Sequence, residues 1–182
     1  MRKVLAVTGT RADYGIYKPV FDALQASEEI DLYLVVTGMH LSKDFGYTVE
    51  TIIADGFSII AKLDTLSAEN TPEGTKQFAI DTQDGCTAVF EKEKPDIILV
   101  LGDRTEMLAA AIAADGLDIP IAHIHGGEFS GSLDDAQRHA ITKLASIHLT
   151  SALPHAEAIK KIKPDENQNS IHVVGAPALD TI

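Results

Sequence analysis

Short apolar runs alternate with helical patterns along the chain, and this alternation constrains the fold more than any other feature. The runs, each rich in Val, Ile or Leu, are Val4–Val7, Leu32–Val36, Phe57–Ala61, Ile97–Leu101, Ile119–Ile124, Ile147–Thr150 and Ile171–Val174. The helical patterns are Tyr17–Ala26, Thr48–Ala54, Thr75–Lys92, Arg104–Ala114, Asp135–Ala145 and His155–Ile162. Strands that alternate with helices are joined by right-handed crossovers into parallel sheets. The sequence therefore predicts an α/β fold, a Rossmann-like parallel sheet with helices on both faces.

The size and composition predict one compact domain. With 182 residues and 45% hydrophobic side chains, the chain can bury a substantial core. No apolar run approaches the roughly 20 residues of a membrane-spanning helix, and the run after Met1 is too short for a secretion signal. The single Cys86 is expected to be a buried, inert thiol. We therefore expect a cytoplasmic protein.

The charge balance bears on possible partners. The formal net charge is −12 at pH 7, which disfavours nonspecific binding to nucleic acid or to an anionic membrane. An anionic ligand would therefore need local cations and backbone N–H groups.

Two segments bear on domain organisation. Leu63–Gly74 is the longest expected loop, and it is either a plain surface loop or a lid over a site. Pro177–Ile182 is expected to begin a new secondary-structure element. We therefore expect the chain to be cut at a domain boundary.

The first candidate segment of the site follows the first strand. Ligands bind outside the carboxyl ends of the strands in such sheets. Gly9–Gly15 opens a helix there but has neither dinucleotide-fingerprint nor P-loop spacing. We expect Gly9, Thr10, Arg11, Asp13 and Gly15 to contact substrate, with Arg11 and free N–H groups binding phosphate. Alternatively, Thr10 and Asp13 form only a capping box.

The second segment, Leu101–Glu106, follows the most apolar strand. Asp103 and Glu106 have capping-box spacing. An N-cap aspartate accepts backbone N–H bonds that lower its pKa, so Asp103 would be a weak base unless substrate binding desolvates it.

The third segment, His123–Glu128, is the least like ordinary structure. His123 and His125 have strand spacing and are expected to face the same side, and the Gly-Gly pair lets a ligand approach the backbone. A zinc site from His123, His125, Glu128 and His139 is an alternative, although no familiar zinc spacing is present.

The fourth segment begins the helix expected near residue 135. Ser132 and Asp135 have capping-box spacing, and Asp135 can pair with Arg138 or His139 one turn on. Each segment alone could be a capped helix. Four of them at strand ends of one sheet favour an active site.

These segments together resemble the hydrolysing UDP-N-acetylglucosamine 2-epimerases of sialic-acid and related nonulosonate biosynthesis. The motifs that carry the resemblance are Gly9–Gly15, Val36–His40, Leu101–Glu106, His123–Glu128 and Arg138–Lys143. The resemblance implies a glycosyltransferase-B-type fold with two Rossmann-like lobes, of which this chain is the N-terminal lobe and lacks the C-terminal nucleotide-binding lobe. It also implies a homo-oligomer.

The resemblance further implies the reaction. UDP would be eliminated in the anti sense from UDP-N-acetylglucosamine to give a 2-acetamidoglucal, and water would then add to release N-acetylmannosamine. The family needs no metal or redox cofactor for this chemistry.

The resemblance also suggests roles for individual residues. Arg11 and Arg104 are the candidate phosphate ligands, and Asp103 and Glu128 are the leading acid/base pair. Asp134 stands where the related non-hydrolysing epimerases have a functional acid, and it is left open which group takes the C2 proton.

The chain departs from its wider family at two places. His125 stands where non-hydrolysing relatives have Glu, so a neutral imidazole can take over acid/base work there. Gly15 and Ile16 stand where those relatives have a Lys, which favours the hydrolysing branch. The rival hypotheses are a non-catalytic nucleotide-sugar or phosphate-binding module and a metal-dependent hydrolase.

Overall fold

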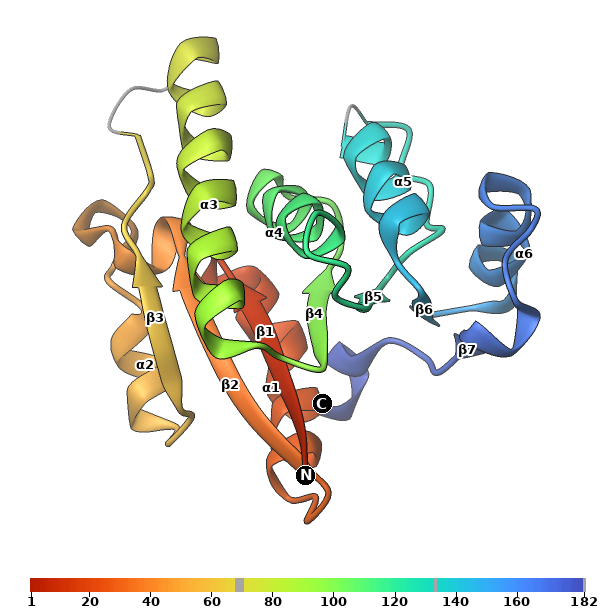
Figure 1. The fold of residues 1–182 in the computed structure, drawn as a ribbon, viewed down its shortest axis with the longest axis horizontal. Helices are drawn as coiled ribbons and strands as arrows, with labels where there is room; N and C mark the ends of the chain where they lie inside the picture. Colours follow the sequence, from red (N-terminus) through yellow and green to blue (C-terminus); the bar gives the residue numbers. More distant parts are fainter. Residues whose placement is uncertain (68–70, 133, 182) are drawn as a thin grey trace.

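A computed structural model describes residues 1–67, 71–132 and 134–181, and within these residues the strands form one parallel sheet. The sheet has seven strands in the order β3-β2-β1-β4-β5-β6-β7 (Figure 1). Their bounds are β1 Arg2–Thr8, β2 Ile30–Thr37, β3 Ile59–Leu63, β4 Ile97–Leu101, β5 Ile121–Ile124, β6 Ile147–Thr150 and β7 Ile171–Val173. Every neighbouring pair is parallel. The predicted parallel α/β fold is confirmed.

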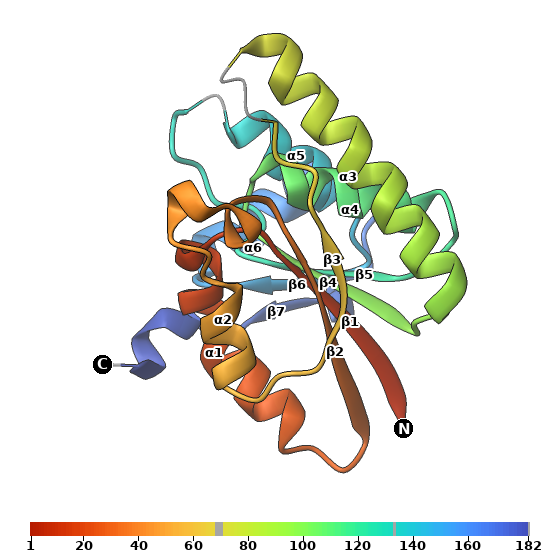
Figure 2. The same ribbon diagram turned by 90° about the vertical axis from the view of Figure 1, so that its left-hand side faces the viewer.

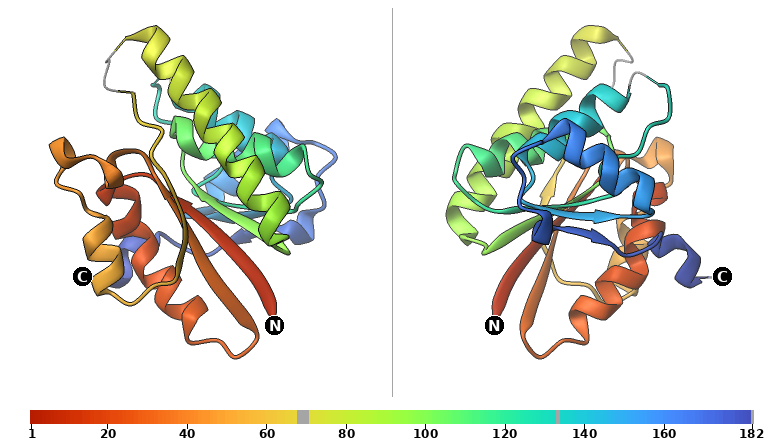
Figure 3. Two further views of the ribbon diagram at one scale, coloured as in Figure 1. Left: turned by 60° about the vertical axis from the view of Figure 1, so that its left-hand side comes forward. Right: turned by 90° about the vertical axis from the view of Figure 1, so that its right-hand side faces the viewer.

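Helices cover both faces of the sheet. The α-helices are α1 Arg11–Gln25, α2 Val49–Ala54, α3 Pro72–Glu93, α4 Thr105–Asp115, α5 Asp134–Leu144 and α6 Leu153–Ile162. Short 3₁₀ turns are η1 Gly38–Leu41, η2 Lys43–Phe45, η3 Gln168–Ser170 and η4 Pro177–Thr181. Helices α1 and α2 lie on one face, and α3, α4 and α5 lie on the other (Figure 2). The final turn η4 returns to pack beside α1 (Figure 3).

The core lies around β2, β1 and β4, three adjacent strands of the sheet. Leu5, Leu34 and Ile98 are fully buried there, as expected for strands covered on both faces. On the α1 side, Tyr17 and Phe21 stack with ring centroids 4.6 Å apart. Cys86 is buried, as predicted, and burial raises the pKa of its thiol to about 12. A thiol with such a pKa is protonated at neutral pH and a poor nucleophile.

Several element boundaries differ from the sequence prediction for local reasons. Helix α1 begins at Arg11 rather than Tyr17, because Thr10 caps it. Strand β3 begins at Ile59, while Phe57 packs edge-on against Phe21 in the core instead. Strand β5 begins only after Pro120, a residue that has no N–H to donate to a sheet.

The expected loop Leu63–Gly74 is shorter in the structure. Leu63 ends β3, and Thr71 is the N-cap of α3, its hydroxyl accepting a hydrogen bond from the Gly74 N–H at 3.0 Å. The middle of the expected lid, residues 68–70, lies outside the described residues, as does Ile182. None of the helices in the described ranges is both long and apolar enough to cross a bilayer.

Replacing Phe21 by Ala tests the core. Phe21 is fully buried against Tyr17 and Phe57, so Phe21→Ala should lower the free energy of unfolding by about 3–5 kcal/mol. Ile53→Ala, at a position of α2 that is 52% exposed, is the control and should cost less than about 1 kcal/mol. Urea denaturation measures both, and equal effects would contradict this packing.

Candidate active site

Arg138 joins three segments at the carboxyl edge of the sheet. It lies on α5 and is 8% exposed. Its guanidinium donates hydrogen bonds to the carboxylate of Asp103 after β4, to the carbonyl oxygen of Glu128 at 3.2 Å and to the carboxylate of Asp135 at 2.7 Å. The sequence predicted only the short-range pair between Asp135 and Arg138. The structure confirms that pair and adds the long-range contacts, which no local pattern signals.

Asp103 does not cap α4, so the capping prediction was wrong. The N-cap is Arg104, without a side-chain hydrogen bond, and the Asp103 carboxylate turns toward Arg138 instead. The pKa of Asp103 is raised, mainly because burial disfavours its charged form; Arg138 and Arg104 oppose this rise, while Asp134 and Asp135 add to it. A raised pKa is the opposite of the expected depression, and it suits proton transfer near neutral pH.

A small hollow at this edge is lined by side chains from two helix starts. Its residues are Asp103, Arg104, Thr105, Asp134 and Gln137. The hollow therefore brings together two predicted acid/base candidates and one predicted phosphate ligand.

Glu106 orients Arg104 from beneath the site. It is 1% exposed, and its carboxylate accepts a hydrogen bond from Arg104 Nε at 2.6 Å. A Cβ on Gly9 would come within 2.2 Å of Glu106 Oε1, so a larger residue at position 9 would displace the buried Glu106 carboxylate. The spacing of Asp103 and Glu106 suggested a capping box. Nothing in the sequence indicated that Glu106 lies against the first loop.

The β1–α1 loop forms the predicted capping box. Thr10 accepts the Asp13 N–H, and Asp13 Oδ2 accepts the N–H groups of Gly9 and Thr10 at 3.1 and 2.9 Å. These two N–H groups are therefore engaged within the loop. The N–H groups of Arg11 and Ala12 make no hydrogen bond to the described residues, and Arg11 is exposed. Gly15 is also exposed, and nothing lies within 4 Å of a Cβ there.

His125 and Glu128 form a second group beside Arg138. His125 Nδ1 lies 3.3 Å from Glu128 Oε1, which also accepts a hydrogen bond from Ser151 Oγ at 2.6 Å. The pKa of His125 is lowered because burial disfavours the imidazolium, although Glu128 opposes this. His125 Nε2 is buried and has no partner among the described residues. A neutral imidazole beside a carboxylate can accept or donate a proton.

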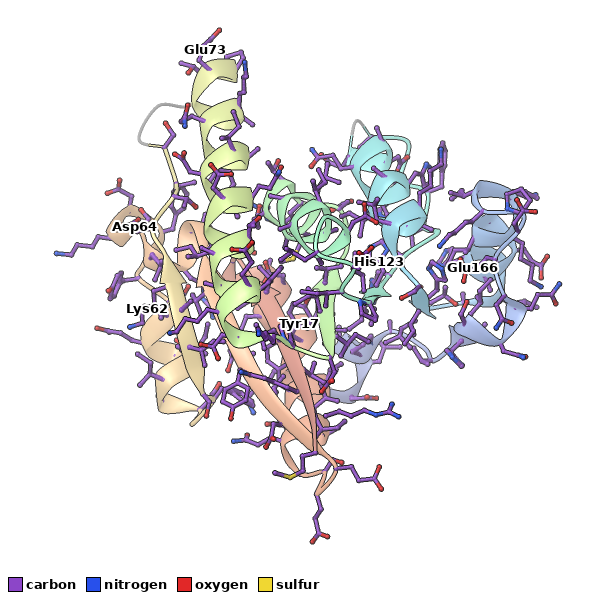
Figure 4. All side chains as sticks on the ribbon, in the orientation of Figure 1. Tyr17, Lys62, Asp64, Glu73, His123 and Glu166 are labelled. Carbon is purple, nitrogen blue, oxygen red and sulfur yellow. The ribbon has the colours of Figure 1, made fainter. Side chains whose placement is uncertain are left out.

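His123 is a structural residue with surroundings unlike those of His125. Strand β5 ends at Ile124 and His125 has φ 63°, so His125 does not continue the strand alternation from which we expected both imidazoles to face one side. His123 is fully buried, with Nε2 2.7 Å from the Gly102 oxygen, on β5 beneath α5 (Figure 4). Its Nδ1 lies 3.3 Å from Thr142 Oγ1. Burial lowers the pKa of His123 to about 3.

The four residues of the alternative zinc site do not gather. His139 stacks on Phe129 instead, with ring centroids 6.5 Å apart. In the part of the chain that the structure describes, no group of three His, Cys, Asp or Glu side chains could hold a metal ion. The geometry gives the metal-dependent alternative no support.

The start of α5 differs from its predicted cap. The Asp135 carboxylate binds Ser130 N–H at 3.0 Å and Gly131 N–H at 2.8 Å, while the Ser132 hydroxyl accepts the Asp134 N–H at 3.2 Å. The Ser130 bond is the main reason that the pKa of Asp135 is lowered. Leu133, in the same predicted segment, lies outside the described residues. Asp135 thus fixes the loop that leads to Asp134.

Comparison with known families agrees with this geometry. The sequence profile of the family described as UDP-N-acetylglucosamine 2-epimerase matches residues 22–182. The chain belongs to this family. A relative from Legionella pneumophila, UDP-N,N'-diacetylbacillosamine 2-epimerase (hydrolyzing), is 48% identical over 184 residues, which are all of this chain and 48% of the relative.

Solved structures of the family share the fold. A UDP-GlcNAc 2-epimerase from Neisseria meningitidis, bound to UDP-GlcNAc, aligns with a TM-score of 0.85 at 23% identity, over 98% of this chain and 47% of that one. A glycosyltransferase from Streptomyces sp. SF2575 aligns with a TM-score of 0.55 at 17% identity, over 86% of this chain and 52% of that one. The chain therefore spans about half the length of these proteins and has the fold of one half.

The buried His123 should make stability depend on pH. Because its pKa is about 3 in the folded protein and about 6.5 when unfolded, the unfolded state binds the proton first as the pH falls. Stability from the neutral imidazole is complete above pH 6.5 and is lost on acidification toward pH 3, by at most about 1.4 kcal/mol per pH unit.

Urea titrations between pH 7 and pH 5 measure this effect, in a window above the titration of most carboxylates. His123→Gln should make the unfolding free energy fall less steeply with acid, and His172→Gln, exposed on β7, is the control. An unchanged slope in His123→Gln would contradict a neutral buried His123.

Proposed function

We propose that this chain is the N-terminal lobe of a hydrolysing 2-epimerase that acts on UDP-N-acetylglucosamine or a related nucleotide-linked N-acetyl amino sugar. The products are UDP and N-acetylmannosamine or its analogue. The observation that carries the proposal is the hollow in which Asp103 and Asp134 lie beside Arg104. The name of the 48% identical Legionella relative, which includes "hydrolyzing", supports this branch of the family.

The proposed reaction has two steps. A base takes the C2 proton, the C–H electron pair forms the C1–C2 double bond, and the C1–O bond breaks to release UDP. Water then adds its oxygen to C1 of the 2-acetamidoglucal, and an acid returns a proton to C2 on the opposite face. The site must therefore accept a proton, donate one and stabilise a leaving diphosphate.

Asp103 and Asp134 are the proposed proton-transfer carboxylates in the hollow. The raised pKa of Asp103 brings it closer to neutral pH, where a general base is most effective. Arg138 fixes the direction of the Asp103 carboxylate. His125, with its lowered pKa and its contact with Glu128, is a third proposed proton-transfer group.

We assign the diphosphate to Arg104 and Arg11. Arg104 is 41% exposed although it pairs with Glu106, and Arg11 projects from the N-terminus of α1. The N–H groups of Arg11 and Ala12 add to this anion site, as helix N-termini commonly do. Asp13 is 3% exposed. We therefore propose that Asp13 shapes the loop through its hydrogen bonds to Gly9 and Thr10 and does not contact substrate.

The decisive substitution is Asp103→Asn, made in the two-lobed protein. It should lower the rate of UDP release at least about 100-fold while circular dichroism stays unchanged. Asp118→Asn is the matched control, because Asp118 is exposed and has φ 55°, a conformation that Asn adopts readily. Full activity in Asp103→Asn would remove this residue from the mechanism. Wild-type binding of UDP without sugar release would favour a non-catalytic binding module.

Removing the cation beside Asp103 should shift the pH profile. Arg138 lowers the pKa of Asp103 against the effect of burial, so Arg138→Gln should move the acid limb of kcat/KM upward by about 1 pH unit. Lys143→Gln removes an exposed cation from the same helix and should leave the limb in place. A limb that stays fixed in Arg138→Gln would show that Asp103 does not set it.

A further inference from the structure

A chain of buried polar side chains lies beneath the β1–α1 loop, outside the hollow. Thr8 and His40 are fully buried and Asp13 is 3% exposed. Thr8 ends β1, His40 lies in η1 after β2, and Thr48 precedes α2. Thr48 is half-buried. Buried polar groups are costly unless they are satisfied, so the connection of Thr8, His40 and Asp13 beneath the loop needs a reason.

The hydrogen bonds of this chain run in one direction. Thr8 donates its only hydroxyl proton to the carboxylate of Asp13. The Thr8 oxygen can therefore only accept from His40 Nε2, which is 3.0 Å away. When His40 carries a single proton, that proton lies on Nε2, and Nδ1 then accepts a hydrogen bond from the Thr48 hydroxyl, at 2.7 Å. The order is Thr48 to His40 to Thr8 to Asp13.

The receiving end of the chain fixes Gly9. Asp13 Oδ2 accepts the N–H groups of Gly9 and Thr10. The backbone N–H of His40 also donates to the carbonyl oxygen of Gly9, at 3.1 Å. His40 thus holds Gly9 directly through a main-chain hydrogen bond and indirectly through the side chains of Thr8 and Asp13. On the other side, a larger residue at position 9 would displace the carboxylate of Glu106.

We propose that His40 is a positioning residue for the phosphate loop, acting through Thr8 and Asp13 without touching substrate. This inference rests on the proposed function, in which Arg11 and the N–H groups of Arg11 and Ala12 bind the diphosphate. The hydrogen bonds from His40 through Thr8 to Asp13 keep the N–H groups of Gly9 and Thr10 turned inward. The N–H groups of Arg11 and Ala12 remain free to bind a ligand. The segment from η1 to the start of α2 is therefore part of the support of the substrate site.

The first test removes the link while preserving its shape. Thr8→Val replaces a hydroxyl by a methyl group, and Thr8→Ser keeps the hydroxyl. In the two-lobed protein, Thr8→Val should raise both the KM for UDP-N-acetylglucosamine and the inhibition constant of UDP at least fivefold, with kcat within twofold. Thr8→Ser should restore both constants. A fall in kcat with KM unchanged would overturn the proposal.

A double-mutant cycle separates positioning from general damage. If the chain acts through the Arg11 loop, Thr8→Val should add less than a twofold change in KM to Arg11→Ala. Independent, multiplicative effects would contradict the proposal. Thr150→Val, which removes an equally buried hydroxyl from β6, is the control. Any effect of Thr150→Val on KM should multiply with the effect of Arg11→Ala.

Amide hydrogen exchange tests the chain without any assay of activity. In the 182-residue chain, Thr8→Val should speed exchange at the Gly9 and Thr10 amides at least tenfold and leave the Ile98 amide in β4 unchanged. Unchanged exchange at Gly9 and Thr10 would overturn the proposal. If the wild-type two-lobed protein released no UDP, the proposed function would fail. The exchange measurement would still decide whether the hydrogen bonds from His40 to Asp13 fix the β1–α1 loop.

Discussion

The buried guanidinium of Arg138 is the interaction on which the arrangement of the candidate site depends. The parallel sheet brings the ends of β4 and β5 to one edge, but it does not fix the loops that leave them. Arg138 binds Asp103 from one loop, the main chain of Glu128 from the other and Asp135 on its own helix. A charge this buried is tolerated only when it is paired. The need to pair Arg138 therefore fixes the positions of its partners and of the loops that carry them.

The proposed phosphate-binding side of the site is built in a different way. The support there is a series of side-chain hydrogen bonds from His40 through Thr8 to Asp13, which in turn binds the backbone of Gly9. The two sides meet where Gly9 lies against Glu106, whose carboxylate holds Arg104 at the rim of the hollow. The groups proposed to bind the diphosphate and those proposed to transfer protons are thus held by separate networks that share one contact.

The sequence predicted those features that depend on neighbours along the chain. Apolar runs gave the strands because both faces of the sheet are covered, and Thr10 and Asp13 gave the cap of α1 because the two residues are three positions apart. Asp103 and Glu106 have the same spacing but do not form a cap. Asp103 has a stronger partner in Arg138, 35 positions away, and local spacing cannot show such a partner. For the same reason the sequence did not reveal the contact of Glu106 with Gly9 or the hydrogen bonds of His40.

The central claim is that this edge of the sheet is half of a site that removes and returns a proton at C2 of a nucleotide-linked sugar. The most direct measurement is turnover of UDP-N-acetylglucosamine by the two-lobed protein in deuterium oxide, followed by NMR of the products. The account predicts free UDP and N-acetylmannosamine that carries one deuterium at C2. A product without deuterium at C2, or sugar that stays attached to UDP, would contradict it.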